Sequence, residues 1–366
     1  MAGTTSSSPL TSLLAKPYSF ETASSMHPSS SADAFYPQAL ECINRLSEPG
    51  FRDLESNFSA RVNLIEWREL ERMLFNIRSK LSYKNAQSAF IANVLSSYPW
   101  YSYDASTSTL TLKPMGSLVH GLFMTIFVKN LGIFLDSLPP PLKERTLGTR
   151  GLLADGFQGR YKGSSRVGDW RVEFRDANMN CEAMLVLEVG FFQPYDSLLK
   201  DVKLWVEGRR EDTTVILANL EEYPSYRNPI QDLDDEDLER LEYLRVEKAR
   251  IRDFVFDGRG RITRDGLVWA GAIKSAFVEV WKRSIVTGLA TQDGDRIDLL
   301  APPPAGPPPQ LQFELSEFMD IPPEYDRSIP FSLDLYRDRI TRKMKELALY
   351  RYETAMKKLK GPMGPK

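Results

Sequence analysis

The chain is poor in cysteine and histidine. Its 366 residues include only two cysteines, Cys42 and Cys181, and two histidines, His27 and His120. Two widely separated cysteines exclude a disulfide framework and do not match the ligand spacings of zinc sites, so a reducing compartment is expected. Because His27 lies in a Ser-rich tail, a Ser-His-Asp or Cys-His hydrolase would depend on His120 alone, and no nucleophile motif lies near it. Carboxylates and a lysine are better candidates for any chemistry.

The sequence also lacks a strong net charge and a membrane-spanning run. The formal net charge is −2, so any contact with DNA or RNA would use a local basic patch. The first twenty residues lack the basic and apolar regions of a secretory signal. No stretch reaches about 18 uninterrupted apolar residues, and the most apolar one, 118–138, is interrupted by His120 and Lys129 and predicts a buried core helix. We therefore expect an intracellular protein, cytoplasmic or nuclear, without a membrane contact.

What the chain does contain is a mixture of helical and strand patterns. Leu64, Trp67, Leu70 and Leu74 recur at three- and four-residue steps, which is typical of an amphipathic helix. The patterns predict the following order along the chain: a disordered Ser-rich tail at 1–34, a helical N-terminal extension at 35–98, an α/β domain at 99–300 with a charged helical insertion at 232–256, a Pro-rich linker at 301–310, and a C-terminal strand and basic helix at 311–366.

The α/β domain predicts a mixed sheet. Two short alternating runs near 100–113 predict a hairpin, and WRVEF and AMLVLEVGF predict strands, the second of which is apolar enough to be buried on both faces. A helix at 194–208 and the strand TTVILANLEE follow. Strand, helix and strand in this order predict a right-handed crossover with parallel pairing. The expected fold class is α/β, a mixed sheet flanked by helices, with additional helices at both ends.

Two carboxylates stand out in this domain. Glu188 lies inside the apolar strand LVLEVGF, where a charge is costly unless it is paired or bound to a metal. Asp169 lies nineteen residues earlier, at the start of the preceding strand. Two carboxylates at neighbouring strand ends can hold Mg²⁺, which activates water and neutralises charge on a phosphodiester. The alternative for Glu188 is a structural ion pair, for example with Arg171, and Asp169 alone could be a turn residue.

The order of these segments resembles the Uma-like group of restriction endonucleases in the PD-(D/E)XK nuclease superfamily. The segments are LTLKPMGSLVH, VGDWRVEF, LVLEVGF, SLLKDVKLWVEG and TTVILANLEE, within about residues 100–222, and FFQPYDSLLKDVKLWVEG also resembles fungal nuclease-like proteins. The resemblance implies a restriction-endonuclease-like fold and Mg²⁺-dependent hydrolysis of nucleic acid. It gives Asp169 and Glu188 the roles of metal ligands.

The family's lysine and proline positions are where this chain departs from the pattern. The usual lysine slot, two residues after the glutamate, is Gly190, and the residue before Asp169 is Gly168 rather than proline. In the Uma-like group the lysine lies on the following helix, which implies Lys200 or, nearby, Lys203. A solvated helix face is the alternative for both lysines.

Two further polar residues could face the same pocket. His120 matches the helix histidine of the family, although a core histidine hydrogen-bonded to backbone is the favoured interpretation. Gln193, just past the strand, is a second pocket candidate or an ordinary loop amide.

Two functions remain open from the sequence. One is a metal-dependent nuclease, and the other is an interaction or scaffold protein that keeps the fold without the chemistry. The C-terminal helix carries many cations, among them Arg342 and Arg351, and could contact a phosphate backbone, although packing of Leu347, Leu349 and Met356 on the domain is the favoured interpretation. A homodimer or a protein partner is also possible on the resemblance.

Overall fold

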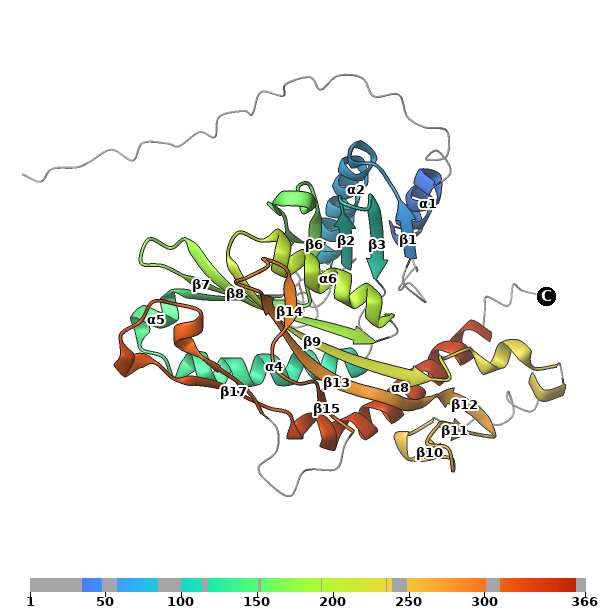
Figure 1. The fold of residues 1–366 in the computed structure, drawn as a ribbon. Helices are drawn as coiled ribbons and strands as arrows, with labels where there is room; N and C mark the ends of the chain where they lie inside the picture. The colour runs from blue at the N-terminus through green and yellow to red at the C-terminus, as the bar shows by residue number, and fades with distance from the viewer. Residues whose placement is uncertain are drawn as a thin grey trace, which may run out of the picture.

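The computed structural model describes residues 35–47, 58–84, 100–113, 118–150, 153–191, 193–234, 236–238, 249–300 and 310–359. The predicted tail at 1–34, the part of the predicted helical extension at 85–98 and the Pro-rich stretch 301–309 lie outside these ranges. The mixed α/β class expected from the sequence is confirmed within the described residues (Figure 1).

The largest sheet has the strand order β14-β13-β9-β8-β7-β4. Its members are β4 (Thr146–Arg150), β7 (Trp170–Arg175), β8 (Cys181–Phe191), β9 (Asp212–Tyr223), β13 (Ala272–Arg283) and β14 (Ala290–Gln292), and β15 (Ile297–Asp298) also pairs with β13. β8 and β9 are parallel and are joined by α6 (Tyr195–Gly208), whereas the other neighbours are antiparallel. The predicted parallel crossover is therefore confirmed.

Helices cover both faces of this sheet. Alternate residues of β8 point to opposite sides, as strand geometry requires. Leu185, Leu187 and Val189 join the core beneath α4 (Leu118–Asp136) and α8 (Asp334–Leu359), together with the hairpin of β16 (Gln310–Glu314) and β17 (Ser328–Ser332). Met184 and Val186 face the cluster beneath α6. Glu188 follows Met184 and Val186 at two-residue steps, so its side chain points to the same face of the sheet, toward α6.

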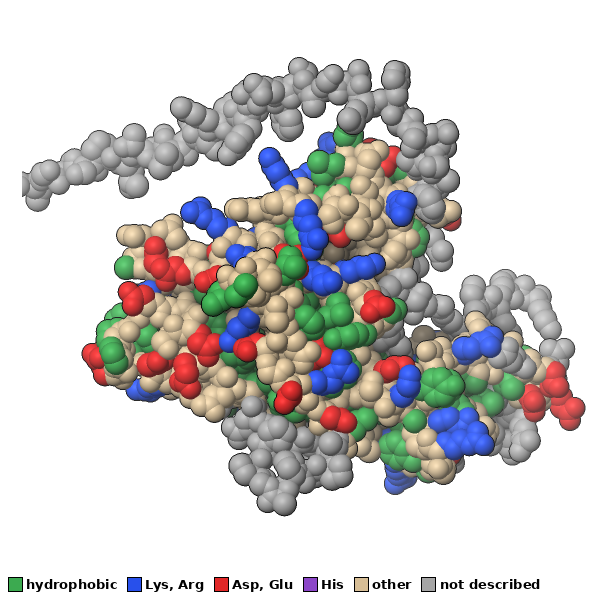
Figure 2. All heavy atoms as spheres, in the orientation of Figure 1, with side chains coloured by type: hydrophobic (Ala, Val, Ile, Leu, Met, Phe, Trp, Pro, Cys, Tyr) green, Lys and Arg blue, Asp and Glu red, His purple; other side chains and the backbone are tan. Residues whose placement is uncertain are grey.

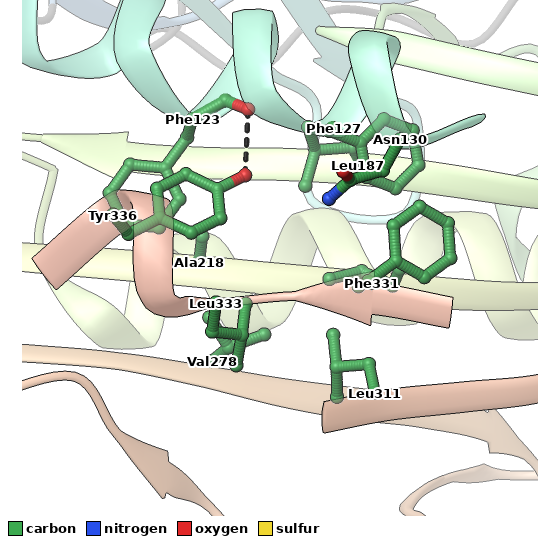
Figure 3. Close-up of a pocket in the computed structure, with 11 residues that line it drawn as sticks. Phe123, Phe127, Asn130, Leu187, Ala218, Val278, Leu311, Phe331, Leu333 and Tyr336 are labelled. Atoms are coloured by element: carbon green, nitrogen blue, oxygen red, sulfur yellow. Dashed lines mark hydrogen bonds between the residues drawn. The ribbon is translucent and has the colours of Figure 1, made fainter. Parts of the chain in front are cut away.

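α4 is a core helix, as its composition predicts. By length and apolar content it could cross a membrane, yet half of its most apolar window is buried inside the protein. The pocket in Figure 3 lies between α4, the sheet and the start of α8, and apolar side chains such as Phe127 and Phe331 dominate its lining. The Tyr336 hydroxyl donates to the Phe123 carbonyl at 2.8 Å, which fixes α8 against α4 (Figure 3).

The N-terminal region forms a second sheet rather than a purely helical extension. α1 (Phe35–Ser47) and α2 (Leu64–Lys84) are present as predicted, but β1 (Phe58–Arg61) lies between them and extends the predicted hairpin of β2 (Trp100–Asp104) and β3 (Thr109–Lys113). The sheet continues through β6 (Ser165–Val167) to β5 (Leu153–Ala154). Trp67 of α2 stacks on Tyr103 with ring centroids 4.9 Å apart, so this sheet has an apolar core of its own.

The prediction of a charged helix over 232–256 is wrong for the C-terminal part of this range. Ile251–Asp253 is a single 3₁₀ turn, and β10 (Val255–Phe256) begins a small sheet with β11 (Ile262–Arg264) and β12 (Leu267–Ala270). The sequence pattern there is typical of a helix, but Val255 and Phe256 pair with β11 instead. Tertiary strand pairing thus overrides the local helix propensity. The remaining elements are the short helix Pro140–Glu144 and 3₁₀ turns at Gly159–Tyr161, Pro229–Asp232, Leu315–Glu317 and Pro323–Tyr325.

α8 packs on the domain, as the favoured interpretation predicted. Leu347 and Met356 are buried, and Leu349 packs against the core. Arg351 is also buried, and its guanidinium donates to both carboxylate oxygens of Glu222 on β9, at 2.7 and 2.8 Å. Glu222 additionally accepts from the Gly271 amide at 2.6 Å. This arginine is thus a structural cation and not a surface contact for phosphate.

Arg351→Met is expected to destabilise the protein by about 3–5 kcal/mol, because it leaves the buried Glu222 carboxylate without its cation. Arg342→Met on the same helix is the control, since Arg342 is 74% exposed and pairs with Glu346, and an exposed pair contributes about 0–1 kcal/mol. Urea unfolding measures both. Equal losses for the two variants would contradict the structural role of Arg351.

Candidate functional site

The candidate site is a buried polar cluster between β8, α6 and the β6–β7 turn. Its central carboxylate is Glu188, only 1% exposed. Trp170 of β7 pairs with Leu187, so Asp169, directly before Trp170, comes beside Glu188 where β7 begins. The structure therefore brings the two predicted carboxylates to the same place.

Glu188 is held by an arginine and a tryptophan of the protein itself. The Arg166 Nε donates to its Oε1 at 2.9 Å, and another guanidinium nitrogen donates to its Oε2 at 2.5 Å. The Trp205 indole donates to Oε1 at 2.6 Å. Bidentate pairing of this kind is the strong form of a carboxylate–arginine contact. The partner suggested from sequence, Arg171, instead pairs with Glu173 at 3.1 Å.

Arg166 is fully buried and connects the two sheets. It belongs to β6, which pairs with β2 of the N-terminal sheet, while its side chain reaches Glu188 on β8 and Asp201 on α6. Burial alone would lower the pKa of its guanidinium, but Asp201 and Glu188 outweigh burial and raise that pKa. Arg166 is therefore a cation at neutral pH.

Asp169 has different partners from Glu188. Its Oδ2 accepts a hydrogen bond from the Val189 amide at 2.7 Å, and its Oδ1 lies 3.1 Å from Nε2 of His120 on α4. His120 is buried, and the Asp169 carboxylate beside its Nε2 places it at the candidate site. Asp169 also lies close enough to contribute to the raised pKa of Arg166.

Gln193 joins the cluster, whereas the two predicted lysines do not. The Gln193 amide donates to Asp201 at 2.9 Å and to Ser197 at 3.1 Å. Lys200 and Lys203 are exposed on α6, and the charged residue of this helix that points into the cluster is Asp201, between them. The resemblance implies a lysine from α6 at this site, but the charged side chain that α6 contributes to the cluster is the aspartate Asp201.

The two glycines that depart from the family pattern have a steric reason. A Cβ at Gly190 would lie 2.1 Å from Cδ1 of Leu198, so the lysine slot is filled by a leucine of α6. A Cβ at Gly168 would lie 2.9 Å from the Trp205 ring. Real Cβ atoms do not approach other atoms so closely. Leu198 and Trp205 therefore occupy the space beside these two glycines.

The donor set does not suit Mg²⁺. A hard dication requires oxygen ligands with free lone pairs, whereas Glu188 is engaged by three N–H donors and a buried guanidinium stands beside it. Across the ranges that the structure describes, no group of three or more His, Cys, Asp or Glu side chains is arranged to hold a metal. The cluster can position strands and helices through ion pairs.

A second buried glutamate lies in the same row of the sheet. Glu188 and Glu279 of β13 both pair across to Leu217 of β9, one on each side. Glu279 accepts from the Tyr195 hydroxyl at 2.8 Å and from Arg296 at 2.7 Å. Burial and the bond to Glu279 raise the pKa of Tyr195 to about 12, so its hydroxyl remains a donor. Both glutamates beneath α6 are therefore neutralised by arginines of the chain.

Sequence reasoning missed Arg166, Asp201 and Glu279. A signal for Asp201 was present, because it falls in the apolar stripe with Leu198, Val202 and Trp205 at helical spacing. A charge in such a stripe is buried and needs a partner. Arg166 had no comparable signal, since β6 is only three residues long.

The comparisons with known proteins give no relative. No protein-family model, no curated protein and no solved structure matches this chain.

Glu188→Gln tests whether Glu188 acts as the partner of an arginine. Removing its charge is expected to destabilise the protein by about 1.5–3 kcal/mol, the contribution of hydrogen bonds to a charged group. A carboxylate in a metal-free acidic site would behave in the opposite way, because losing it relieves repulsion. Glu182→Gln, exposed on the same strand, is the control for urea unfolding. A stabilised Glu188→Gln protein would rule out the ion-pair interpretation.

Gly190→Ala is expected to destabilise the protein by about 1–3 kcal/mol through overpacking against Leu198. Leu198→Ala removes the colliding atoms, so the double variant should lose less stability than the sum of the single losses. Unfolding curves of the four proteins give this coupling. Additive losses would show that Leu198 does not fill the slot.

Proposed function

We propose that this chain is a non-catalytic protein with a PD-(D/E)XK nuclease-like fold that acts as an interaction or scaffold module. The fold part rests on the order of elements: the hairpin β2–β3, α4 with His120, β7 after Asp169, β8 with Glu188, α6 and β9. This is the order on which the resemblance to the Uma-like nucleases is based.

One observation supports the loss of catalysis above all others. Glu188, the position of the metal ligand, is closed by Arg166 and Trp205. A buried arginine supplies the positive charge that Mg²⁺ would supply in an active nuclease, and it does so permanently. Such a pair stabilises the protein only while both partners are present, so the cluster is expected to be structural.

Nucleic acid is the first partner class to test for this module. Lys200 and Lys203 are exposed on α6, and Figure 2 shows Lys and Arg side chains gathered over α6 and the elements above it. Cations on one face can contact a phosphate backbone without cutting it. Binding without cleavage would agree with the proposal.

The decisive experiment is a cleavage assay on plasmid and single-stranded DNA with Mg²⁺ or Mn²⁺. Protein shown to be folded by circular dichroism is expected to leave both substrates intact with either metal. Glu188→Ala serves as the matched variant. Metal-dependent cleavage by the natural chain that Glu188→Ala abolishes would overturn the proposal and assign a metal nuclease.

A further inference from the structure

The turn between β13 and β14 presents an unusual apolar tip. Ile285 is 101% exposed, Val286 87% and Leu289 52%, so three large aliphatic side chains project into solvent within five positions. Scattered single apolar residues are normal at a surface, but a contiguous group marks an interaction site. We define these three residues as the apolar tip.

The tip is an ordered structure. The Ser284 amide donates to the Leu289 carbonyl at 2.8 Å, and the Gly288 amide donates to the Ser284 carbonyl at 2.8 Å. The Ser284 hydroxyl accepts from the Val286 and Thr287 amides, and Gly288 has a φ of +71°, which favours glycine. Polar residues and glycine therefore build the turn, and its geometry gives no reason for isoleucine and valine at its outermost positions.

Two arginine-bearing segments lie near the base of this turn. The Arg283 guanidinium donates to the Val206 carbonyl at 2.9 Å and also contacts the Arg209 carbonyl, so the backbone leading to the exposed Arg210 lies beside the Arg283 side chain. On the other strand, the Ala290 amide donates to Glu207, which is paired with Arg160. The Arg160 side chain is still 59% exposed.

We propose that the apolar tip inserts into the interface of an anionic lipid bilayer. A convex tip of three aliphatic side chains is small compared with a stable protein interface, which buries about 800 Å² on each partner and favours aromatic anchors. A bilayer accepts such a projection, and arginines at its base meet anionic headgroups at the depth where the apolar side chains reach the acyl boundary. Figure 2 shows hydrophobic and basic side chains side by side on this face.

This inference goes beyond the proposed function and does not depend on it. The expectation of no membrane contact followed from the lack of a spanning run, which does not bear on a peripheral contact through one turn. The chemistry of the lipid is defined only by its negative charge and its acyl interior.

The test is co-sedimentation of the full chain with vesicles of phosphatidylcholine alone or with added phosphatidylserine. The natural chain should bind the anionic vesicles and lose binding as salt is raised. Ile285→Asp with Val286→Asp should lower the partition coefficient at least about tenfold, because two aliphatic side chains no longer leave water. Arg210→Glu should weaken binding about fivefold or more on anionic vesicles only.

Ile65→Asp is the matched control, because Ile65 is 85% exposed on α2 and lies outside the tip. It should bind as the natural chain does. All four substituted residues are exposed, and circular dichroism verifies that each variant is folded. No binding to either vesicle, or unchanged binding of the double variant, would overturn the proposal. Self-association in solution that the double variant abolishes, without vesicle binding, would assign the tip to a second copy of the chain instead.

Discussion

The guanidinium of Arg166 is the charge on which the interior of this protein depends. It enters from the N-terminal sheet, yet its two anionic partners lie on the central strand and on the crossover helix of the main sheet. Burying a charged guanidinium is costly unless its carboxylate partners are buried beside it. The three elements β6, β8 and α6 therefore have to pack together for Arg166 to be buried. The N-terminal sheet is consequently part of the same cooperative structure as the α/β core and not an independent addition.

The same constraint explains why the cluster differs from a catalytic site. Catalytic carboxylates need an accessible volume and a ligand-free lone pair, and their mutual repulsion is relieved by a bound metal. Here Trp205, Leu198 and Arg166 fill that volume and neutralise that repulsion. Glycines at 168 and 190 fit this filling, because a Cβ at either position would collide with Trp205 or Leu198.

Much of the fold could be predicted from local patterns. Apolar periodicity and glycine or proline punctuation are properties of short windows, which is why α4, β8, α6, β9 and α8 were expected at nearly their observed positions. The neighbouring placement of Asp169 and Glu188 followed from strand order. The identity of the partner of Glu188 did not, because β6 is three residues long and pairs with β2, far away in sequence. Similarly, β1 and the small sheet that includes β10 depend on tertiary pairing that no window reveals.

The pair formed by Glu222 and Arg351 has a consequence for biosynthesis. The two residues are 129 positions apart in the sequence. Because the ribosome makes β9 well before α8, the Glu222 carboxylate has no cation until Arg351 has been added. A nascent chain that stalls between these two elements therefore lacks the partner of a carboxylate that is buried in the folded protein.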